Sequence, residues 1–360
     1  MICPTLQDLP PAPDGKTGWP WTEATPPGPA EMPGGKAWPK VSVVTPSFNQ
    51  GQFLEETIRS VLLQGYPDLE YLIIDGGSTD DSVEVISKYK AWLAYWVSEK
   101  DHGQTHAINK GWRLSSGAFL AWLNSDDFLL PGSLAGAVIA MEEERCDLAF
   151  ADAYIVDEKS RKRPAIYPAA QPQLTDMLST WNCPVPQQGF VMRREILERC
   201  GYLDESLYFA MDFEFWVRCL LNDQKFVCRH TPSAAFRVYR TNKTMSQHSR
   251  YVEDVCTILT QVRSRSRDPE IVAICTRSLL RSYANAAHNA DAWGLKKLVW
   301  RYVFRDIARR GWAAVADDLS LMLFNLLPGR APWVRFLYYG IERRVRSLFK
   351  PTKARHLSQC

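Results

Sequence analysis

The 360-residue sequence lacks the short cysteine and glycine motifs that mark several common protein classes. Its nine cysteines include no Cys-x-x-Cys pair and are odd in number, which argues for reduced thiols rather than a disulfide framework or a zinc site. Residues 45–51, after the first expected strand, contain neither Gly-x-Gly-x-x-Gly nor Gly-Lys-Ser/Thr. Dinucleotide-dependent enzymes and Walker-type nucleotidases are therefore disfavoured.

Long apolar runs are also missing. The first residues lack the basic start and apolar stretch of a signal peptide. The best apolar stretches, residues 128–141 and 319–327, are interrupted or ended by Pro-Gly, and neither approaches the roughly 20 residues that span a bilayer. We expect a cytoplasmic protein, soluble or peripheral on the inner face of the cell membrane.

The net charge of +3 hides an asymmetry between the two ends of the chain. Residues 294–360 contain 14 Lys and Arg against 4 Asp and Glu, interleaved with aromatic residues. Such a basic amphipathic segment suits an anionic membrane surface, and a helical subdomain with solvated charges is the alternative. No nucleic-acid-binding motif occurs in it, so no nucleic acid partner is expected.

Three regions follow from composition and pattern. Residues 1–39 contain ten prolines and form an extended arm, either anchored on the next domain by its tryptophans or loose. Residues 40–248 form the main domain, and residues 249–360 a basic helical region. In the main domain, strands alternate with helices, which predicts an α/β fold with a mainly parallel sheet flanked by helices. The expected strands are residues 41–45, 69–75, 94–98 and 119–123, and the expected helices are residues 53–62, 82–91 and 105–114.

Polar side chains follow three of these strands. Thr45, Asp75 and the pair Asp126 and Asp127 come at strand ends, where parallel sheets bind their ligands. Two adjacent carboxylates at that edge suit a divalent metal that carries phosphates, because such a hard cation prefers oxygen ligands. A solvated loop or a helix cap would explain an isolated Asp-Asp pair equally well.

Four motifs in order raise this pattern above chance: residues 43–49 (VVTPSFN), 73–80 (IIDGGSTD), 107–111 (AINKG) and 123–127 (LNSDD). Together they resemble the motif series of family 2 glycosyltransferases, and the resemblance extends to about residue 245. It implies the GT-A fold, a Rossmann-like α/β domain, here with an added C-terminal helical segment.

The resemblance implies the roles of individual residues. Thr45, Pro46 and Ser47 would border the nucleotide base, and Asp75 would accept a hydrogen bond from it, whereas capping of the next turn is the alternative for Asp75. The remaining positions implied for the nucleotide sugar are Asn49, Gly103, Asn109, Ser125 and Asp126.

Asp126 and Asp127 resemble the metal-binding element of the family. Asp127 would ligate Mg²⁺ or Mn²⁺ bridging the diphosphate, and Asp126 would reach the ribose or a metal-bound water. Relatives often carry a histidine at the place of Tyr239. Its absence leaves Arg237, Arg240 and Lys243 as the expected diphosphate contacts, by charge.

The residues around 211–218 resemble the segment that holds the catalytic carboxylate. An inverting transferase needs one base that takes the proton from the acceptor hydroxyl. We expect Asp212 to be this base, and Glu214 is the alternative, because two residues apart on a helix point in different directions. Helix capping would be the non-catalytic explanation for both.

These features predict an inverting, metal-dependent glycosyltransferase. It would move a sugar from a UDP- or GDP-sugar to a hydroxyl of a glycan or lipid-linked acceptor, in surface polysaccharide or glycolipid synthesis. A sugar-1-phosphate nucleotidyltransferase would need an arginine-rich phosphate loop, and residues 45–51 contain no arginine. A non-catalytic nucleotide-sugar-binding protein would not need both Asp127 and Asp212.

Overall fold

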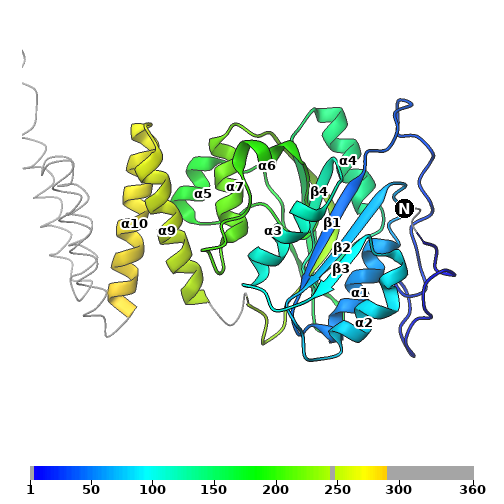
Figure 1. The fold of residues 1–360 in the computed structure, drawn as a ribbon. Coiled ribbons are helices and arrows are strands. Elements are labelled where there is room, and N and C mark those ends of the chain that lie inside the picture. Colours follow the sequence, from blue (N-terminus) through cyan, green and yellow to red (C-terminus); the bar gives the residue numbers. More distant parts are fainter. Residues whose placement is uncertain (1–3, 244–247, 290–360) are drawn as a thin grey trace, which may run out of the picture. The chain divides into compact units, whose positions relative to one another are not determined.

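The computed structural model describes residues 4–243 and 248–289, and the chain divides into two compact units, residues 1–255 and 256–360. The helices and strands are drawn in Figure 1. In chain order they are β1 (Val41–Ser47), α1 (Gly51–Leu62), β2 (Leu69–Asp75), α2 (Ser82–Tyr89), η1 (Lys90–Trp92), β3 (Tyr95–Ser98), α3 (Gln104–Leu114), β4 (Phe119–Trp122), β5 (Phe128–Leu129), α4 (Ser133–Glu144), β6 (Leu148–Val156), β7 (Lys162–Tyr167), α5 (Leu174–Thr180), β8 (Val191–Arg193), α6 (Glu195–Cys200), α7 (Met211–Leu221), β9 (Phe226–Arg237), α9 (His248–Arg265) and α10 (Pro269–Asn289).

In the described part of the chain, nine strands form one sheet of order β3-β2-β1-β4-β8-β6-β9-β5, with β7 paired to β6. The four strands predicted from the sequence, β1 to β4, run parallel to their neighbours among themselves. β8 pairs antiparallel with both β4 and β6. The fold is therefore the predicted GT-A type of α/β sheet, with an antiparallel strand joining its two halves.

Both faces of the sheet are covered, as the continuous apolar strands predict. Figure 1 shows α1 and α2 on one side of the strands and α3 on the other. In β1, Val43 faces the core shared with α1, and Val44 packs under α3, where a Cβ on Gly111 would lie 2.4 Å from Val44. Gly111 of the third motif therefore lets α3 approach β1 closely.

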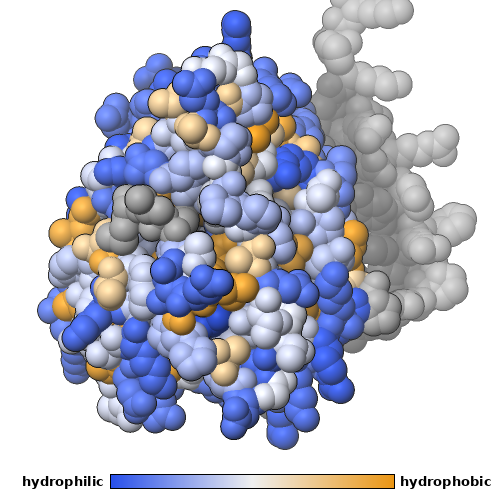
Figure 2. Space-filling view, turned by 90° about the vertical axis from the view of Figure 1, so that its right-hand side faces the viewer, coloured by the Kyte–Doolittle hydropathy of each residue, from blue (hydrophilic) through white to orange (hydrophobic). Residues whose placement is uncertain are grey.

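The proline-rich arm is anchored on the domain rather than loose. Leu9, Met32 and Trp38 belong to the core cluster that includes α1 and α2. The Trp19 indole Nε1 donates a hydrogen bond to the carbonyl of Leu129 at 2.7 Å. Seen from the side on which the arm lies in Figure 1, the surface is mainly hydrophilic with small, separate apolar patches (Figure 2).

Arg59 of α1 is the main polar anchor of the arm. Its guanidinium is 1% exposed and donates hydrogen bonds to the carbonyls of Pro10, Pro20 and Trp21 at 2.8 to 3.0 Å. These carbonyls lie in a segment that makes few bonds of its own, because proline has no amide hydrogen. One buried side chain of the domain thus satisfies three acceptors of the arm.

Replacing this anchor should destabilise the protein. Arg59→Met leaves three buried carbonyls without a donor, and we expect the free energy of unfolding to fall by about 3 kcal/mol, with faster proteolysis between residues 4 and 39. Urea denaturation and limited proteolysis measure both effects. Lys36→Met is the matched control, because it removes only the exposed ion pair of the arm with Glu142, at 3.3 Å. Equal stability of both variants would contradict the anchoring role.

The described residues also bear on the sequence-based expectations about the cysteines and about membrane-spanning helices. The seven cysteines within the described residues form no disulfide. No helix in residues 4–243 and 248–289 combines the length and apolarity needed to cross a membrane. The basic segment at 294–360, for which we considered membrane binding, lies outside the described residues.

Candidate functional site

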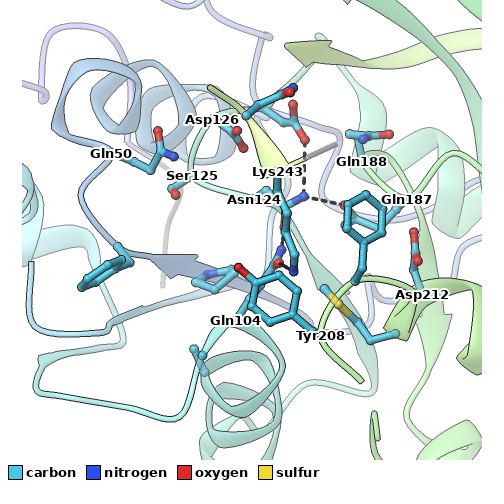
Figure 3. Close-up of a pocket in the computed structure, with 18 of the residues that line it drawn as sticks. Gln50, Gln104, Asn124, Ser125, Asp126, Gln187, Gln188, Tyr208, Asp212 and Lys243 are labelled. Atoms are coloured by element: carbon cyan, nitrogen blue, oxygen red, sulfur yellow. Dashed lines mark hydrogen bonds between the residues drawn. The ribbon is translucent and has the colours of Figure 1, made fainter. Parts of the chain in front are cut away.

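A cavity of about 980 Å³ is lined by residues that follow β1, β2 and β4, at the carboxyl ends of the parallel strands (Figure 3). The segment before α7 and the residues after β9 complete its lining. Its size is in the range of pockets that bind small molecules and cofactors. Of the residues predicted to converge at the strand ends, Asp126 and Asp127 line this cavity, whereas Thr45 and Asp75 do not, although Ser47 and Gly76 near them do.

The loop Asn124–Asp127 is held in place by helix α1. β4 ends at Trp122, and Thr57 of α1 donates hydrogen bonds to the carbonyls of Ser125 and Asp127 at 2.9 and 2.6 Å. Thr57 is fully buried, so this attachment is shielded from water. The loop carries its carboxylates on a rigid support.

The two carboxylates differ in their access to the cavity. Asp127 is 1% exposed, and its Oδ1 accepts a hydrogen bond from the backbone N–H of Arg237 at 2.9 Å. Asp126 is partly exposed, and its Oδ2 accepts a hydrogen bond from the Tyr239 hydroxyl at 2.9 Å. Figure 3 shows Asp126 beside Ser125 and Gln50 at the cavity. Asp126 therefore offers the more open oxygens, and Asp127 lies behind it.

The electrostatics of the cavity favour a cation. Burial raises the pKa of Asp126 and raises that of Asp127 well above its usual value, and the charge of Asp126 raises the latter further. The charged residues lining the cavity are Asp101, Asp126, Asp127 and Asp212, against Lys100 and Lys243. A diphosphate cannot enter such an acidic cavity favourably unless additional positive charge accompanies it.

The donor set fits Mg²⁺ or Mn²⁺, because both are hard cations that prefer carboxylate oxygens. Two adjacent carboxylates, Asp126 and Asp127, border the cavity. Within the described residues there is no cluster of three or more His, Cys, Asp or Glu side chains that could hold a metal. The other ligands would have to come from a bound diphosphate and from water.

Arg237 does not have the role that its charge predicts. The side chain is 1% exposed; Nη2 pairs with Glu56 at 2.9 Å and Nε donates to the carbonyl of Asp126 at 2.7 Å. Nη1 donates to the Ser160 hydroxyl at 3.0 Å, so all three nitrogens are engaged. Arg237 thus supports the acidic loop from behind, and the expectation that it contacts a diphosphate is wrong for this conformation.

Tyr239, at the place where the family resemblance implies a histidine, lies beside Asp126 at the cavity. Besides its bond to Asp126, its hydroxyl accepts a hydrogen bond from the Gln50 amide at 3.1 Å. Its ring packs on Phe53, with centroids 5.0 Å apart. A neutral phenol therefore positions Asp126 in this chain.

Asp212 lies at the start of α7 and lines the same cavity. Its Oδ1 accepts a hydrogen bond from the neighbouring N–H of Phe213 at 2.7 Å, while Asp254 accepts bonds from the N–H groups of Phe209 and Ala210. Asp254 thus satisfies the N–H groups just before α7, whereas Asp212 accepts from an N–H group of the first turn of α7, so its contacts match the capping explanation as well as its position at the cavity. Burial raises the pKa of Asp212, as a carboxylate base would require.

Glu214, the alternative base, is engaged elsewhere. It is 8% exposed and forms a bidentate pair with Arg218, with N–O distances of 2.6 and 2.8 Å. It is not among the residues that line the cavity. Of the two acids, only Asp212 reaches the site.

The structure divides the positions predicted for the nucleotide sugar into two groups. Those that line the cavity are Pro46, Ser47, Gly103, Ser125 and Asp126. Those that do not line it are Thr45, Asn49, Asp75 and Asn109. The second group belongs to the framework around the cavity, and its contacts with a nucleotide stay predictions.

Asp75 has its acceptor capacity filled within the chain. Oδ2 accepts hydrogen bonds from the N–H of Ser78 at 2.9 Å and the hydroxyl of Ser98 at 2.7 Å, and a longer one from the N–H of Gly77. Oδ1 accepts one from the Ser78 hydroxyl at 2.6 Å. These contacts match the capping alternative, and a nucleobase would have to replace one of them.

The other framework residues also have partners of their own. The Thr45 hydroxyl bonds to the Tyr71 hydroxyl at 3.0 Å. The Asn109 amide donates to the carbonyl of Leu203 at 2.9 Å and so ties α3 to the segment before α7. The Asn49 side-chain oxygen accepts a hydrogen bond from the backbone N–H of Thr79 at 2.9 Å. The Thr45 bond thus joins β1 to β2, and the Asn49 bond joins the loops that follow these two strands.

Sequence reasoning missed a chain of amide side chains that crosses the cavity (Figure 3). Lys243 donates to Gln104 at 3.0 Å, and Gln104 donates to Asn124 at 2.7 Å. Asn124 then donates to Gln187, and Gln187 to the carbonyl of Trp122, both at 2.9 Å. No local pattern predicts these contacts, because they join segments brought together by the order of the strands.

Comparison with known proteins places this site in context. Residues 42–201 match the protein family described as Glycosyl transferase family 2. An uncharacterised glycosyltransferase of Methanocaldococcus jannaschii is 28% identical over 196 residues, which covers 52% of this chain and 67% of that protein. Chondroitin synthase of Escherichia coli is 34% identical over 121 residues, covering 33% of this chain and 17% of that protein.

Solved structures share the fold at low sequence identity. The crystal structure of S. aureus TarS residues 1–349 has a TM-score of 0.52 and 18% identity, and the match covers 80% of each chain. The same protein in complex with UDP-GlcNAc has a TM-score of 0.52 and 17% identity, and the match covers 85% of this chain and 88% of that one. At this level of sequence identity, the similarity shows that the fold is shared.

Proposed function

The chain belongs to glycosyltransferase family 2 through residues 42–201, and from this premise we propose that it is an inverting, metal-dependent enzyme that moves a sugar from a nucleoside diphosphate to an acceptor hydroxyl. The observation that carries the proposal is that one cavity contains both the carboxylate pair Asp126 and Asp127 and the separate carboxylate Asp212. Leaving-group stabilisation and base catalysis can thus occur in the same cavity.

The donor would bind at the end of the cavity formed by Pro46, Ser47 and the Asn124–Asp127 loop. Mg²⁺ or Mn²⁺, when bound, would neutralise the charge that develops on the departing diphosphate. Asp126 and Asp127 would hold this ion. Lys243, expected from its charge to contact the diphosphate, lines the same cavity and donates a hydrogen bond to Gln104. That TarS binds UDP-GlcNAc on the same fold supports a nucleotide-sugar donor for this chain.

The acceptor hydroxyl would meet Asp212 as general base. The carboxylate takes the proton while the hydroxyl oxygen attacks the anomeric carbon and the bond from that carbon to the diphosphate breaks, which inverts the configuration. Its raised pKa strengthens it as a base for this step. Asp212 acts alone in this role, because Glu214 is paired with Arg218.

The contacts of the two aspartates support a different division of the metal site from the sequence-based hypothesis. That hypothesis makes Asp127 the metal ligand and has Asp126 reach the ribose or a metal-bound water. We propose instead that Asp126, the more open carboxylate, is the principal ligand and that Asp127 supports it, since the backbone of Arg237 holds one Asp127 oxygen. The two hypotheses predict opposite rankings of the corresponding Asn variants in metal affinity.

The acceptor would be a glycan or a lipid-linked saccharide, in the synthesis of a surface polysaccharide or glycolipid. Similarity to the polysaccharide-forming chondroitin synthase over 121 residues supports this assignment. A sugar-1-phosphate nucleotidyltransferase loses further support, because the loop between β1 and α1 presents no arginine to the cavity.

Donor turnover tests the proposal. We expect the full chain, with Mg²⁺ or Mn²⁺ present, to release UDP or GDP from at least one of a panel of nucleotide sugars. The rate of this release should fall at least tenfold in EDTA. Coupled detection of the released nucleoside diphosphate provides the rate, and thermal shift provides donor binding independently. Donor binding without any turnover, across the panel and with acceptors added, would favour a non-catalytic binding protein.

A further inference from the structure

We propose that the acceptor is an anionic glycan, whose carboxylate or phosphate binds a cationic clamp formed by Lys243 and Tyr208, which line the cavity, and by Arg250, which lies over the Tyr208 ring. The inference rests on the proposed function, since it concerns the acceptor side of the same site. It specifies the chemistry of a substrate that the family alone leaves open.

Tyr208 holds the two cations of the clamp. The Lys243 ammonium lies 4.5 Å from the centroid of the Tyr208 ring, and the Arg250 guanidinium carbon lies 4.4 Å from it. The ring lines the cavity and is 45% exposed, so part of it is accessible to a ligand. Cation–π contacts thus place two positive groups beside one exposed aromatic at the cavity.

Neither cation has an ion-pair partner among the described residues, although the charges of Asp212 and Asp254 act on Lys243 from a longer distance. Within the described residues, no carboxylate lies within 4 Å of the charged nitrogens of Lys243 or Arg250, although nine other ion pairs occur. Arg250 is exposed, so its guanidinium N–H groups are accessible from solvent. The sequence between Lys243 and His248 contains no acidic residue. Two positive groups held together without an ion pair favour an anion as the missing partner.

The charges around Lys243 agree with this geometry. Burial lowers the pKa of Lys243 to about 8, and the positive charge of Arg250 lowers it as well. Asp212 and Asp254 act in the opposite direction, yet the carboxylate of Asp254 is already bound by two backbone N–H groups. A bound anion would relieve the repulsion between the two cations. Binding should weaken as the pH rises through about 8, where Lys243 loses its charge.

The neighbouring wall favours a glycan over a lipid tail. Trp181 and Gln188 line the same cavity, and the Trp181 Nε1 and Gln188 Oε1 atoms are buried without a hydrogen-bond partner. An apolar chain would leave this donor and this acceptor unsatisfied, at a cost of about 1–3 kcal/mol each. Sugar hydroxyls can satisfy both, while the apolar ring faces of Trp181 and Phe236 suit the C–H face of a pyranose.

The clamp also lies close to the proposed chemistry. The charge of Lys243 acts on Asp212, and Lys243 reaches Gln104 at the donor side through a 3.0 Å hydrogen bond. An anionic group held there would therefore place an acceptor hydroxyl of the same or the next sugar near the base. This location makes the clamp a determinant of acceptor specificity, distinct from donor recognition by the Asn124–Asp127 loop.

A pair of arginine variants tests the clamp. Arg250→Gln removes one clamp cation, and Arg113→Gln is its matched control, because Arg113 lies 4.6 Å from the ring centroid of Tyr202 in a similar cation–π pair that does not line the cavity. Each full-length protein, loaded with UDP or GDP and Mn²⁺, is applied to an array of uronic-acid glycans, phosphate-bearing glycans and carboxyl-reduced counterparts. Vesicles with and without a polyprenyl phosphate form a separate arm.

We expect the wild type and Arg113→Gln to bind anionic glycans, and Arg250→Gln to bind them about tenfold more weakly, in line with a lost charge-assisted hydrogen bond. Tyr208→Ala should weaken binding similarly, and Tyr208→Phe should keep it. Equal binding of carboxyl-reduced glycans, equal binding by the two arginine variants, no glycan binding, or binding of polyprenyl phosphate vesicles alone would each overturn the inference. Donor turnover is measured separately, so failure of the proposed function is recognised independently.

Discussion

Asp212→Asn is expected to reduce sugar transfer about 10³-fold, equivalent to roughly 4 kcal/mol of transition-state stabilisation. The amide keeps the shape of the side chain and can still contact the N–H of Phe213 or a neighbouring group, but it cannot take the proton of the acceptor hydroxyl. Donor affinity should change less than twofold, because the donor end of the cavity does not include Asp212 in its binding groups. Steady-state transfer and nucleoside diphosphate binding measure the two effects.

The pH dependence separates base catalysis from a structural effect. The base must be ionised, so kcat should fall as the pH drops through the raised pKa of Asp212, above the ordinary aspartate value of about 3.9. The residual rate of Asp212→Asn should lack this decline. Glu214→Gln is the control: it disturbs the pair with Arg218 and should lower stability, while kcat keeps its pH profile. A 10³-fold loss in Glu214→Gln with near-normal Asp212→Asn would exchange the roles of the two acids.

Arg237→Met should produce the largest loss of stability, about 3–5 kcal/mol, because it leaves Glu56 charged and buried without its partner. The same change removes the bond to the carbonyl of Asp126, so the acidic loop should lose its geometry together with its support. Urea denaturation measures the free energy of unfolding, and Mn²⁺-dependent nucleotide binding reports on the loop.

Two controls distinguish the buried pair from an ordinary surface contact. Arg161→Met removes a 2.6 Å ion pair with Asp157 in which the arginine is largely exposed, and we expect the free energy of unfolding to change little. Adding Glu56→Gln to Arg237→Met removes the unpaired charge and should recover part of the lost stability. If Arg237→Met is no less stable than Arg161→Met, the buried pair does not support the loop.

The parallel half of the fold could be predicted from the sequence because its strands are apolar on both faces and alternate with amphipathic helices. The second half could not, because β5, β8 and β9 pair with strands far away in the sequence. The attachment of the proline-rich arm could not be predicted for the same reason, because it too depends on contacts between distant segments. Its prolines predict an extended chain, whereas its attachment depends on Arg59, a charged residue in a helix that sequence patterns assign to the surface.

The site was predictable to the extent that chemistry follows residue type. Of the carboxylates at strand ends, Asp126 and Asp127 line the cavity and Asp75 does not. Asp212, at the start of α7, lines it as well. The charge of Arg237 predicted a contact with the diphosphate, which is wrong, because its burial and its pairing with Glu56 arise only in the folded chain. Neutral residues such as Gln187 carry no functional signal in the sequence, although Gln187 joins the amide chain beside the acidic loop.

The central claim is that Asp126 and Asp127 hold a divalent cation for the donor diphosphate. Calorimetric binding of UDP and GDP to the full chain, with Mn²⁺ and with EDTA, tests it most directly in the wild type, Asp126→Asn and Asp127→Asn. We expect at least one nucleotide to bind the wild type about 100-fold more tightly with Mn²⁺, and this gain to vanish in Asp126→Asn and to shrink in Asp127→Asn. Equally tight nucleotide binding in EDTA, unchanged by either substitution, would contradict the claim.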